Sequence, residues 1–137
     1  MLNIEAIDHV AITVADIAAS TAFYQRVLGG RIVAEHAPHG RGHGQVLVRS
    51  VAIGAAMLNL HQAGNGIVPV AARPTPGSAD LCLRIAGTAA EARAVIEGLG
   101  LAIDTGPVAR RSATGDAGVS IYFRDPDGNL IELMARA

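Results

Sequence analysis

Aromatic side chains are scarce in this chain of 137 residues, which has two Phe, two Tyr and no Trp. Since 50% of the residues are hydrophobic, we expect a core of Ala, Val, Ile and Leu. The one cysteine, Cys82, excludes an internal disulfide, and we expect a buried thiol there. No apolar run is long enough for a membrane span, and residues 1–15 lack the cationic start of a signal peptide. These absences predict a cytoplasmic protein with no membrane partner.

The chain also lacks a large excess of either positive or negative charge. The chain has 11 basic and 12 acidic residues, for a net charge of −1. Proteins that bind nucleic acid usually carry a cluster of basic residues, so this balance of charge argues against a nucleic-acid partner. The length suits one ordinary domain with a sizeable core, and we predict a single domain over residues 1–137.

The first half of the chain shows one strand, one helix and then three strands. Alternating β-branched residues predict a strand at 7–14, and Asp16 can cap a helix over 17–28 that Gly29 and Gly30 end. Further strands are expected at 31–36, 45–54 and 55–62. The Gly/His-rich segment 36–44 contains His36, His39 and His43, and we interpret it as a mobile loop, a candidate lid, more readily than as a metal cluster.

The second half repeats this order after a proline-rich connector at 63–78. A strand is expected at 79–85, and Thr88 with Glu91 forms a capping box that opens a helix ending at Gly100. Strands at 101–108, 119–124 and 129–134 follow, with a loop at 110–118 and an Asp-Pro-Asp-Gly turn at 125–128.

The two halves also match position by position. An offset of 71 residues relates four positions of the first half, His9, Leu28, Gly29 and Ile32, to Asp80, Leu99, Gly100 and Ile103 of the second half. An offset of 73 residues relates Leu58, Asn59 and Leu60 to Ile131, Glu132 and Leu133. Such self-similarity indicates an internal repeat. We therefore predict an α+β fold of two tandem βαβββ modules, at about 5–62 and about 79–135.

Four polar side chains occupy related places in this repeat: His9, Asn59, Asp80 and Glu132. Glu132 is the most unusual, because it stands in the otherwise apolar NLIEL, where a buried carboxylate is costly unless it is paired or binds a metal. A pseudo-two-fold between the modules would bring all four to one cavity. Each residue also has a plainer interpretation. Glu132 could be a surface acid on an edge strand, and His9 could be a hydrogen-bonded core histidine. Asp80 could be a cap or turn residue, and Asn59 could only form hydrogen bonds.

Three further residues are candidates for the same cavity. His61 shares its strand face with Asn59 and is an alternative ligand or base. Tyr122 and Arg124 share a strand face and could hold an anionic substrate.

Two segments resemble the vicinal oxygen chelate superfamily, which holds glyoxalase I, extradiol dioxygenases, fosfomycin-resistance enzymes and bleomycin-resistance proteins. They are DHVAITVADIAASTAFYQRVLGG (8–30) and SIYFRDPDGNLIEL (120–133). NLHQAG and AARPTPGSADLC (71–82) are similar to the branch of glyoxalase domain-containing protein 5 and its bacterial relatives called virulence proteins. The resemblance implies a curved mixed sheet around a divalent metal, with His9, Asp80 and Glu132 as ligands. A nitrogen and oxygen ligand set suits Mn²⁺, Ni²⁺, Fe²⁺, Co²⁺ or Zn²⁺.

The resemblance implies, as leading function, a metal-dependent lyase or isomerase of the glyoxalase I type acting on a small substrate that chelates through oxygen. Glu132 or His61 would move the proton, while Asn59, Tyr122 and Arg124 would bind the substrate. A metal-free small-molecule binding or resistance protein is the alternative, and an Fe²⁺-dependent extradiol-type dioxygenase is a third. Members of this kind commonly form homodimers, and we expect one here.

Overall fold

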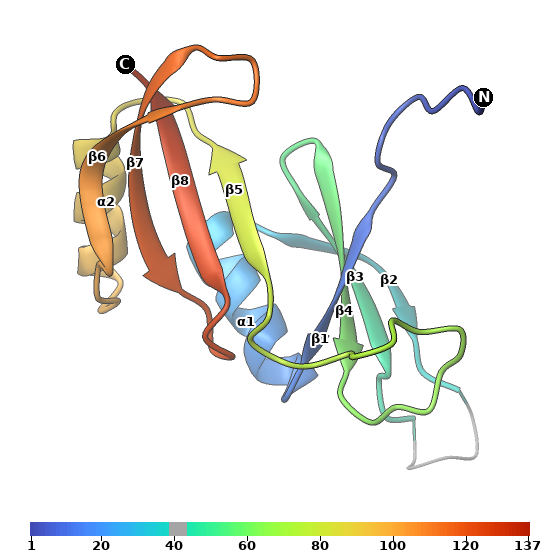
Figure 1. Cartoon of the computed structure of the whole chain (residues 1–137). Coiled ribbons are helices and arrows are strands. Elements are labelled where there is room, and N and C mark those ends of the chain that lie inside the picture. The colour runs from blue at the N-terminus through green and yellow to red at the C-terminus, as the bar shows by residue number, and fades with distance from the viewer. Residues whose placement is uncertain (39–43) are drawn as a thin grey trace. The chain divides into compact units, whose positions relative to one another are not determined.

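The computed structural model describes residues 1–38 and 44–137 (Figure 1), so that His39 and His43 of the expected loop lie outside it. The chain divides into two compact units, Met1–Pro76 and Gly77–Ala137, here called unit 1 and unit 2. Our expectation of a single domain over the whole chain stays a prediction.

Unit 1 holds one helix and a four-stranded mixed sheet. In chain order its elements are β1 (Val10–Val14), α1 (Ile17–Leu28), β2 (Arg31–His36), β3 (Val48–Ile53) and β4 (Ala56–Gln62). The strand order is β1-β4-β3-β2, with β1 parallel to β4 and the other pairs antiparallel.

Unit 2 has the same organisation. Its elements are β5 (Asp80–Arg84), α2 (Ala89–Gly98), β6 (Thr105–Arg111), β7 (Ala117–Arg124) and β8 (Leu130–Arg136). The strand order β5-β8-β7-β6 repeats that of unit 1, including the parallel first pair. The predicted α+β fold of two tandem βαβββ modules is thereby confirmed.

Helix α1 has the bounds that its sequence signals predict. The Asp16 side chain accepts a hydrogen bond from the Ala19 amide at 3.0 Å, and Gly29 ends the helix in a left-handed conformation with φ 64°. The side chain of Gln62 fixes the start of the helix to the end of β4: its Oε1 accepts from the Ile17 amide at 2.8 Å, and its Nε2 donates to the Ala15 carbonyl at 2.7 Å.

Each helix packs on one face of its own sheet and leaves the other face to polar side chains. In unit 1 the helix-covered face buries Tyr24, Val51 and Leu60, and in unit 2 it buries Ile96, Ile121, Phe123 and Ile131. The alternation of strand residues therefore divides each sheet into a core face and a second face, which we call the free face.

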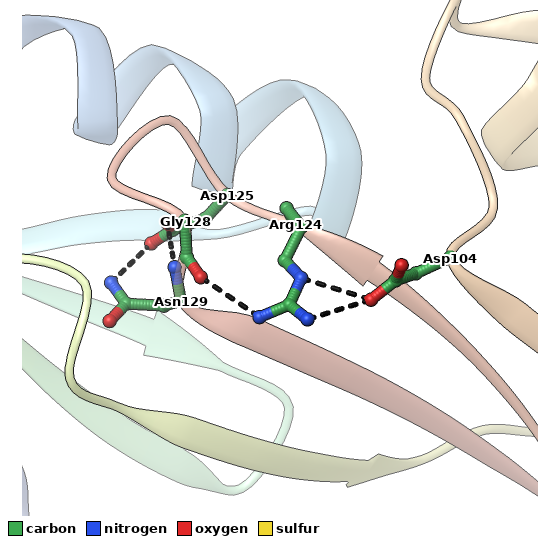
Figure 2. Close-up of polar contacts among 5 residues, drawn as sticks. All are labelled: Asp104, Arg124, Asp125, Gly128 and Asn129. Carbon is green, nitrogen blue, oxygen red and sulfur yellow. Dashed lines mark hydrogen bonds and ion pairs between the residues drawn. The ribbon is translucent and has the colours of Figure 1, made fainter.

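The Asp-Pro-Asp-Gly turn is held by buried polar contacts (Figure 2). Asp125 is 5% exposed, and its Oδ1 accepts from the amides of Asp127 and Asn129, both at 2.9 Å. Its Oδ2 accepts from Asn129 Nδ2 at 2.7 Å, while Asn129 Oδ1 accepts from the Ala79 amide at 2.8 Å. The turn thus fixes the start of β8 next to the start of β5.

One strand lies at other residues than the sequence predicts. Residues 101–108 were expected to be extended, but β6 runs over Thr105–Arg111, and Leu101 and Ile103 precede it. The register with β7 shifts between Thr105 and Val108, around Gly106 and Pro107. No helix in the described part of the chain is long and apolar enough to cross a bilayer.

Candidate functional site

The strand registers place Asn59 and Glu132 at equivalent positions of the two units. In unit 1, Asn59 is paired with Ala11 of β1 and Ser50 of β3. In unit 2, Glu132 is paired with Cys82 of β5 and Tyr122 of β7. Residues that are directly opposite share a face of the sheet, so both side chains lie on the free face of their unit. The repeat inferred from sequence therefore holds at the level of register.

Buried polar atoms without a partner concentrate on these faces. Among the described residues, three side-chain atoms are buried and have no hydrogen-bond partner: Asn59 Oδ1, Ser120 Oγ and Glu132 Oε1. Ser120 precedes Tyr122 by two residues and so shares the free face of unit 2 with Glu132. An unpaired buried oxygen costs free energy, and such atoms usually await a ligand, an ion or a water molecule. These oxygens make the free faces the candidate functional surfaces.

Tyr122 and Arg110 form a short chain of contacts that ends at Glu132. The Arg110 Nε donates a hydrogen bond to Tyr122 Oη at 2.9 Å, and its guanidinium also lies 5.4 Å from the centre of the Tyr122 ring. Burial is the main cause that raises the pKa of Tyr122; the hydrogen bond from Arg110 opposes it, and a hydrogen bond with Glu132 adds to it. Tyr122 therefore stays neutral at physiological pH, and it stands directly opposite the carboxylate of Glu132 in the strand register. Arg110 was not predicted, because its reach depends on the register of β6.

Cys82 contacts Glu132 from the other side. Partial burial, followed by the charge of Glu132 and a hydrogen bond with it, raises the pKa of Cys82 to about 11. The side chain thus stays a thiol at neutral pH and is a donor, not a nucleophile. Our expectation of a buried thiol was wrong: Cys82 is exposed, because β5 is an edge strand of its own sheet.

His9 lies just before β1 and is exposed, with its Nδ1 2.7 Å from Asp8 Oδ1. When the ring donates this hydrogen bond, the lone pair of Nε2 remains for a metal ion. A carboxylate that holds the second ring nitrogen is the usual outer partner of a metal-binding histidine. Asp8 is a candidate site residue that we did not predict, although the Asp-His dipeptide was the available signal.

His61 lies on the free face of unit 1 with Asn59, since residues two apart on β4 point the same way. Burial, and then the charge of His9, lower its pKa from the usual 6.5. The imidazole is therefore neutral at physiological pH. In this form it can accept a proton or bind a metal ion.

The other two predicted residues lie on the free face of unit 2. Asp80 is exposed at the start of β5, and its alternation with Cys82 puts it on that face. Arg124 shares the face, but its guanidinium is engaged: Nε and Nη2 donate to Asp104 Oδ2 at 3.0 and 2.7 Å, and Nη1 donates to the Gly128 carbonyl (Figure 2). A substrate role for Arg124 stays a prediction.

The residues present fit a divalent metal by their chemistry. Glu132 offers a buried carboxylate oxygen without a partner, and His9 offers a ring nitrogen whose neighbour is held by Asp8. Over residues 1–38 and 44–137, no three His, Cys, Asp or Glu side chains are grouped closely enough to hold an ion. The predicted ligands His9, Asp80 and Glu132 come from both units, and their joint action stays a prediction, as do the homodimer and the cytoplasmic location.

Two relatives match nearly the whole chain. Virulence protein STM3117 of Salmonella typhimurium is 42% identical over 130 residues, which cover 95% of this chain and 83% of the relative. Its crystal structure superposes with a TM-score of 0.84 at 40% identity, over 99% of this chain and 100% of that one. Glyoxalase domain-containing protein RDO1 of Mycosarcoma maydis is 39% identical over 132 residues, covering 96% of this chain and 69% of the relative.

More distant structures share the fold alone. Lactoylglutathione lyase from Agrobacterium tumefaciens has a TM-score of 0.70 at 24% identity, over 97% of this chain and 95% of that one. The fosfomycin resistance protein FosX from Listeria monocytogenes, in complex with Mn(II), has a TM-score of 0.64 at 21% identity over 98% of this chain and 93% of that one.

The family model of the glyoxalase/bleomycin resistance protein/dioxygenase superfamily matches residues 6–133. This range spans both units and contains every candidate site residue. The chain belongs to the glyoxalase/bleomycin resistance protein/dioxygenase superfamily.

Proposed function

We propose that this protein is a metal-dependent lyase or isomerase of the glyoxalase I type, acting on a small substrate with two neighbouring oxygen atoms. The observation that carries the proposal is the buried, unpartnered Oε1 of Glu132 on the free face of unit 2. A structural carboxylate would be expected to satisfy both of its oxygens, because a buried polar atom left alone is costly. Membership of the superfamily supports the same conclusion.

The proposed ligands are His9 through Nε2 and Glu132 through Oε1, with Asp80 or His61 as a further donor. When bound, a divalent ion supplies Lewis acidity that polarises a carbonyl oxygen of the substrate. Asp8 would hold the ring of His9 in the orientation that presents Nε2.

The chain's own residues would then move the proton. A carboxylate oxygen of Glu132 accepts a proton from the carbon beside the carbonyl group and returns it to the neighbouring position. Tyr122 and Cys82 keep this carboxylate oriented through their hydrogen bonds with it. His61, neutral because its pKa is lowered, is the second candidate base.

Metal content tests the proposal directly. Protein purified without chelator should contain near-stoichiometric metal, and His9→Ala and Glu132→Gln should each lose most of it. Glu97→Gln is a matched control, because it removes the same charge from the exposed surface of α2. Equal metal in all four samples would overturn the proposal. The breakdown of lactoylglutathione, the substrate in the name of a structural neighbour, is the first activity to assay.

A metal-free binding protein is the second candidate, and the observation that favours it is Asn59. This position is equivalent to Glu132, yet it carries an amide, which is a poor metal ligand. Wild-type protein that contains no metal but binds small amphipathic compounds would support this alternative.

A further inference from the structure

Unit 2 contains a cavity of about 980 Å³ that none of the predicted site residues lines. It lies where β5 and β8 end and β7 begins, and Figure 1 shows the loop between β6 and β7 at this same end of the sheet. Its volume is at the upper end of the range typical of small-molecule sites. All of its lining residues belong to unit 2.

Two arginines from neighbouring strands line the cavity. Arg84 ends β5 and is paired with Met134 of β8, and Arg136 follows Met134 by two residues. Strand alternation therefore puts Arg84, Met134 and Arg136 on the same face as Glu132. Within the described residues Arg136 has no ion-pair partner, and the contact of Arg84 is a weak hydrogen bond to Thr114 Oγ1 at 3.3 Å.

The acidic side chain that lines the cavity already accepts a hydrogen bond. Asp116 also lines the cavity, but Thr114 Oγ1 donates to its Oδ2 at 2.6 Å within the loop. The same loop is closed by the Ser112 amide, which donates to the Asp116 carbonyl at 2.9 Å, and by the Asp116 amide, which donates to Ser112 Oγ at 3.1 Å. This wall is therefore built: the Asp116 carboxylate keeps its charge but is held by a hydroxyl of its own loop, and among the described residues it forms no ion pair with either arginine. The two guanidinium groups are left with positive charge to offer.

The rest of the lining is apolar or small. Ile85, Met134 and Ala135 contribute hydrocarbon surface, and Gly118 contributes none. A Cβ at Gly118 would come within 3.1 Å of Met134 Cγ and 3.0 Å of the Ala135 carbonyl, so a glycine lets Met134 pack closely against β7 at this wall. Apolar walls with a few convergent charges are the common pattern of ligand pockets.

We propose that this cavity binds a small organic anion, whose oxyanion group pairs with Arg84 and Arg136 and whose apolar part packs on Ile85 and Met134. Arginine suits this task, because its planar fork matches a carboxylate or a phosphate. Glu132 stands two residues from Met134 on the same face. The site would therefore hold the anionic end of the substrate while the reacting carbons extend toward Glu132; this last step rests on the proposed function.

Binding to chelator-treated protein tests the cavity independently of any metal. The probes are hexanoate, the uncharged hexanamide and inorganic phosphate, and the readout is the shift of backbone amide signals by NMR. Hexanoate should bind about tenfold more tightly than hexanamide, which corresponds to one charge-assisted contact. Phosphate should bind more weakly than hexanoate, and the shifts should centre on residues 112–118 and 134–137.

Variants of the two arginines test whether they bind the anionic group of the ligand. Arg84→Gln and Arg136→Gln should each weaken hexanoate binding at least about threefold, and the double variant about tenfold. Arg31→Gln, an exposed arginine of unit 1, should have no effect.

Three results would overturn this inference: equal affinity for hexanoate and hexanamide, no effect of either arginine variant, or phosphate binding as tight as that of hexanoate. The proposed function fails separately, through metal content. Hexanoate binding by a protein that also contains no metal when purified without chelator would retain the cavity and reject the lyase.

Discussion

Tyr122 of β7 and Glu132 of β8 lie directly opposite each other on the sheet face that α2 leaves free. Arg110 holds the tyrosine from one side, and the carboxylate keeps one buried oxygen without a partner. The acid is thus oriented by neutral donors yet incompletely satisfied. That combination is typical of a group kept ready for a ligand or for a proton.

Glu132→Gln should make Cys82 more reactive. The charge of Glu132 and its hydrogen bond help to raise the pKa of Cys82 to about 11, so their loss should lower that pKa, although partial burial, the larger cause, remains. The thiolate fraction at pH 8–9 should rise severalfold. Alkylation of metal-free protein across this pH range measures it without ambiguity, because the chain has a single cysteine. Glu97→Gln should leave the profile as in wild type, and superimposable profiles for Glu132→Gln would refute the contact.

Asp8→Asn should weaken metal binding about tenfold, the lower end of the effect seen when an outer-shell partner is removed. The neutral amide is a poorer acceptor for the Nδ1–H of His9, so the ring is less well oriented and less basic. Titration with Mn²⁺ or Zn²⁺ against a chromophoric competitor gives the affinity. Glu5→Gln, which removes the same charge from an exposed position nearby, is the control. If both variants bind metal as tightly as wild type, Asp8 has no such role.

His61 should make the fold less stable in mild acid. Because folding lowers the pKa of His61 below 6.5, the unfolded chain takes up this proton at a higher pH than the folded chain. Stability therefore falls as the pH drops through about 6.5, and the loss is complete once the folded histidine is also protonated. The effect should be small, since the side chain is only partly buried. His61→Gln should flatten the dependence of Tm between pH 7.5 and 5; a curve parallel to that of wild type would contradict this.

The two polar networks of Figure 2 should differ in their contribution to stability. Asn129 is 1% exposed, and Asn129→Ala removes the hydrogen bonds that its side chain forms with the Ala79 amide and with Asp125 Oδ2. We expect a loss of roughly 2–3 kcal/mol in the free energy of unfolding. Asp104→Asn breaks an exposed ion pair with Arg124 and should cost at most about 1 kcal/mol. Urea unfolding compares the two variants, and equal costs would show that the buried turn is not the stronger contact.

Local sequence signals were sufficient to predict the two helices and the internal repeat. Asp16 and Gly29 bound α1 where the sequence indicated, and the capping box of Thr88 and Glu91 opens α2. The alternation of NLIEL placed Glu132 on its face, because a period of two leaves only two choices. Features that depend on neighbours within a few residues were therefore predictable.

Features set by pairing between distant strands were not. Leu101 and Ile103 resemble strand residues, yet β6 begins at Thr105, where the register with β7 allows pairing. The contact of Arg110 with Tyr122 depends on that register as well. Cys82 was assigned to the interior from its residue type, whereas its place on an edge strand exposes it.

The matching registers of the two units have an evolutionary consequence. Each unit closes its own core under its own helix, so each free face is built by one sheet. A duplicated scaffold of this kind can keep an amide at Asn59 while it keeps an acid at Glu132. A substitution at this register position then changes the chemistry of one free face without altering the strand order of its sheet.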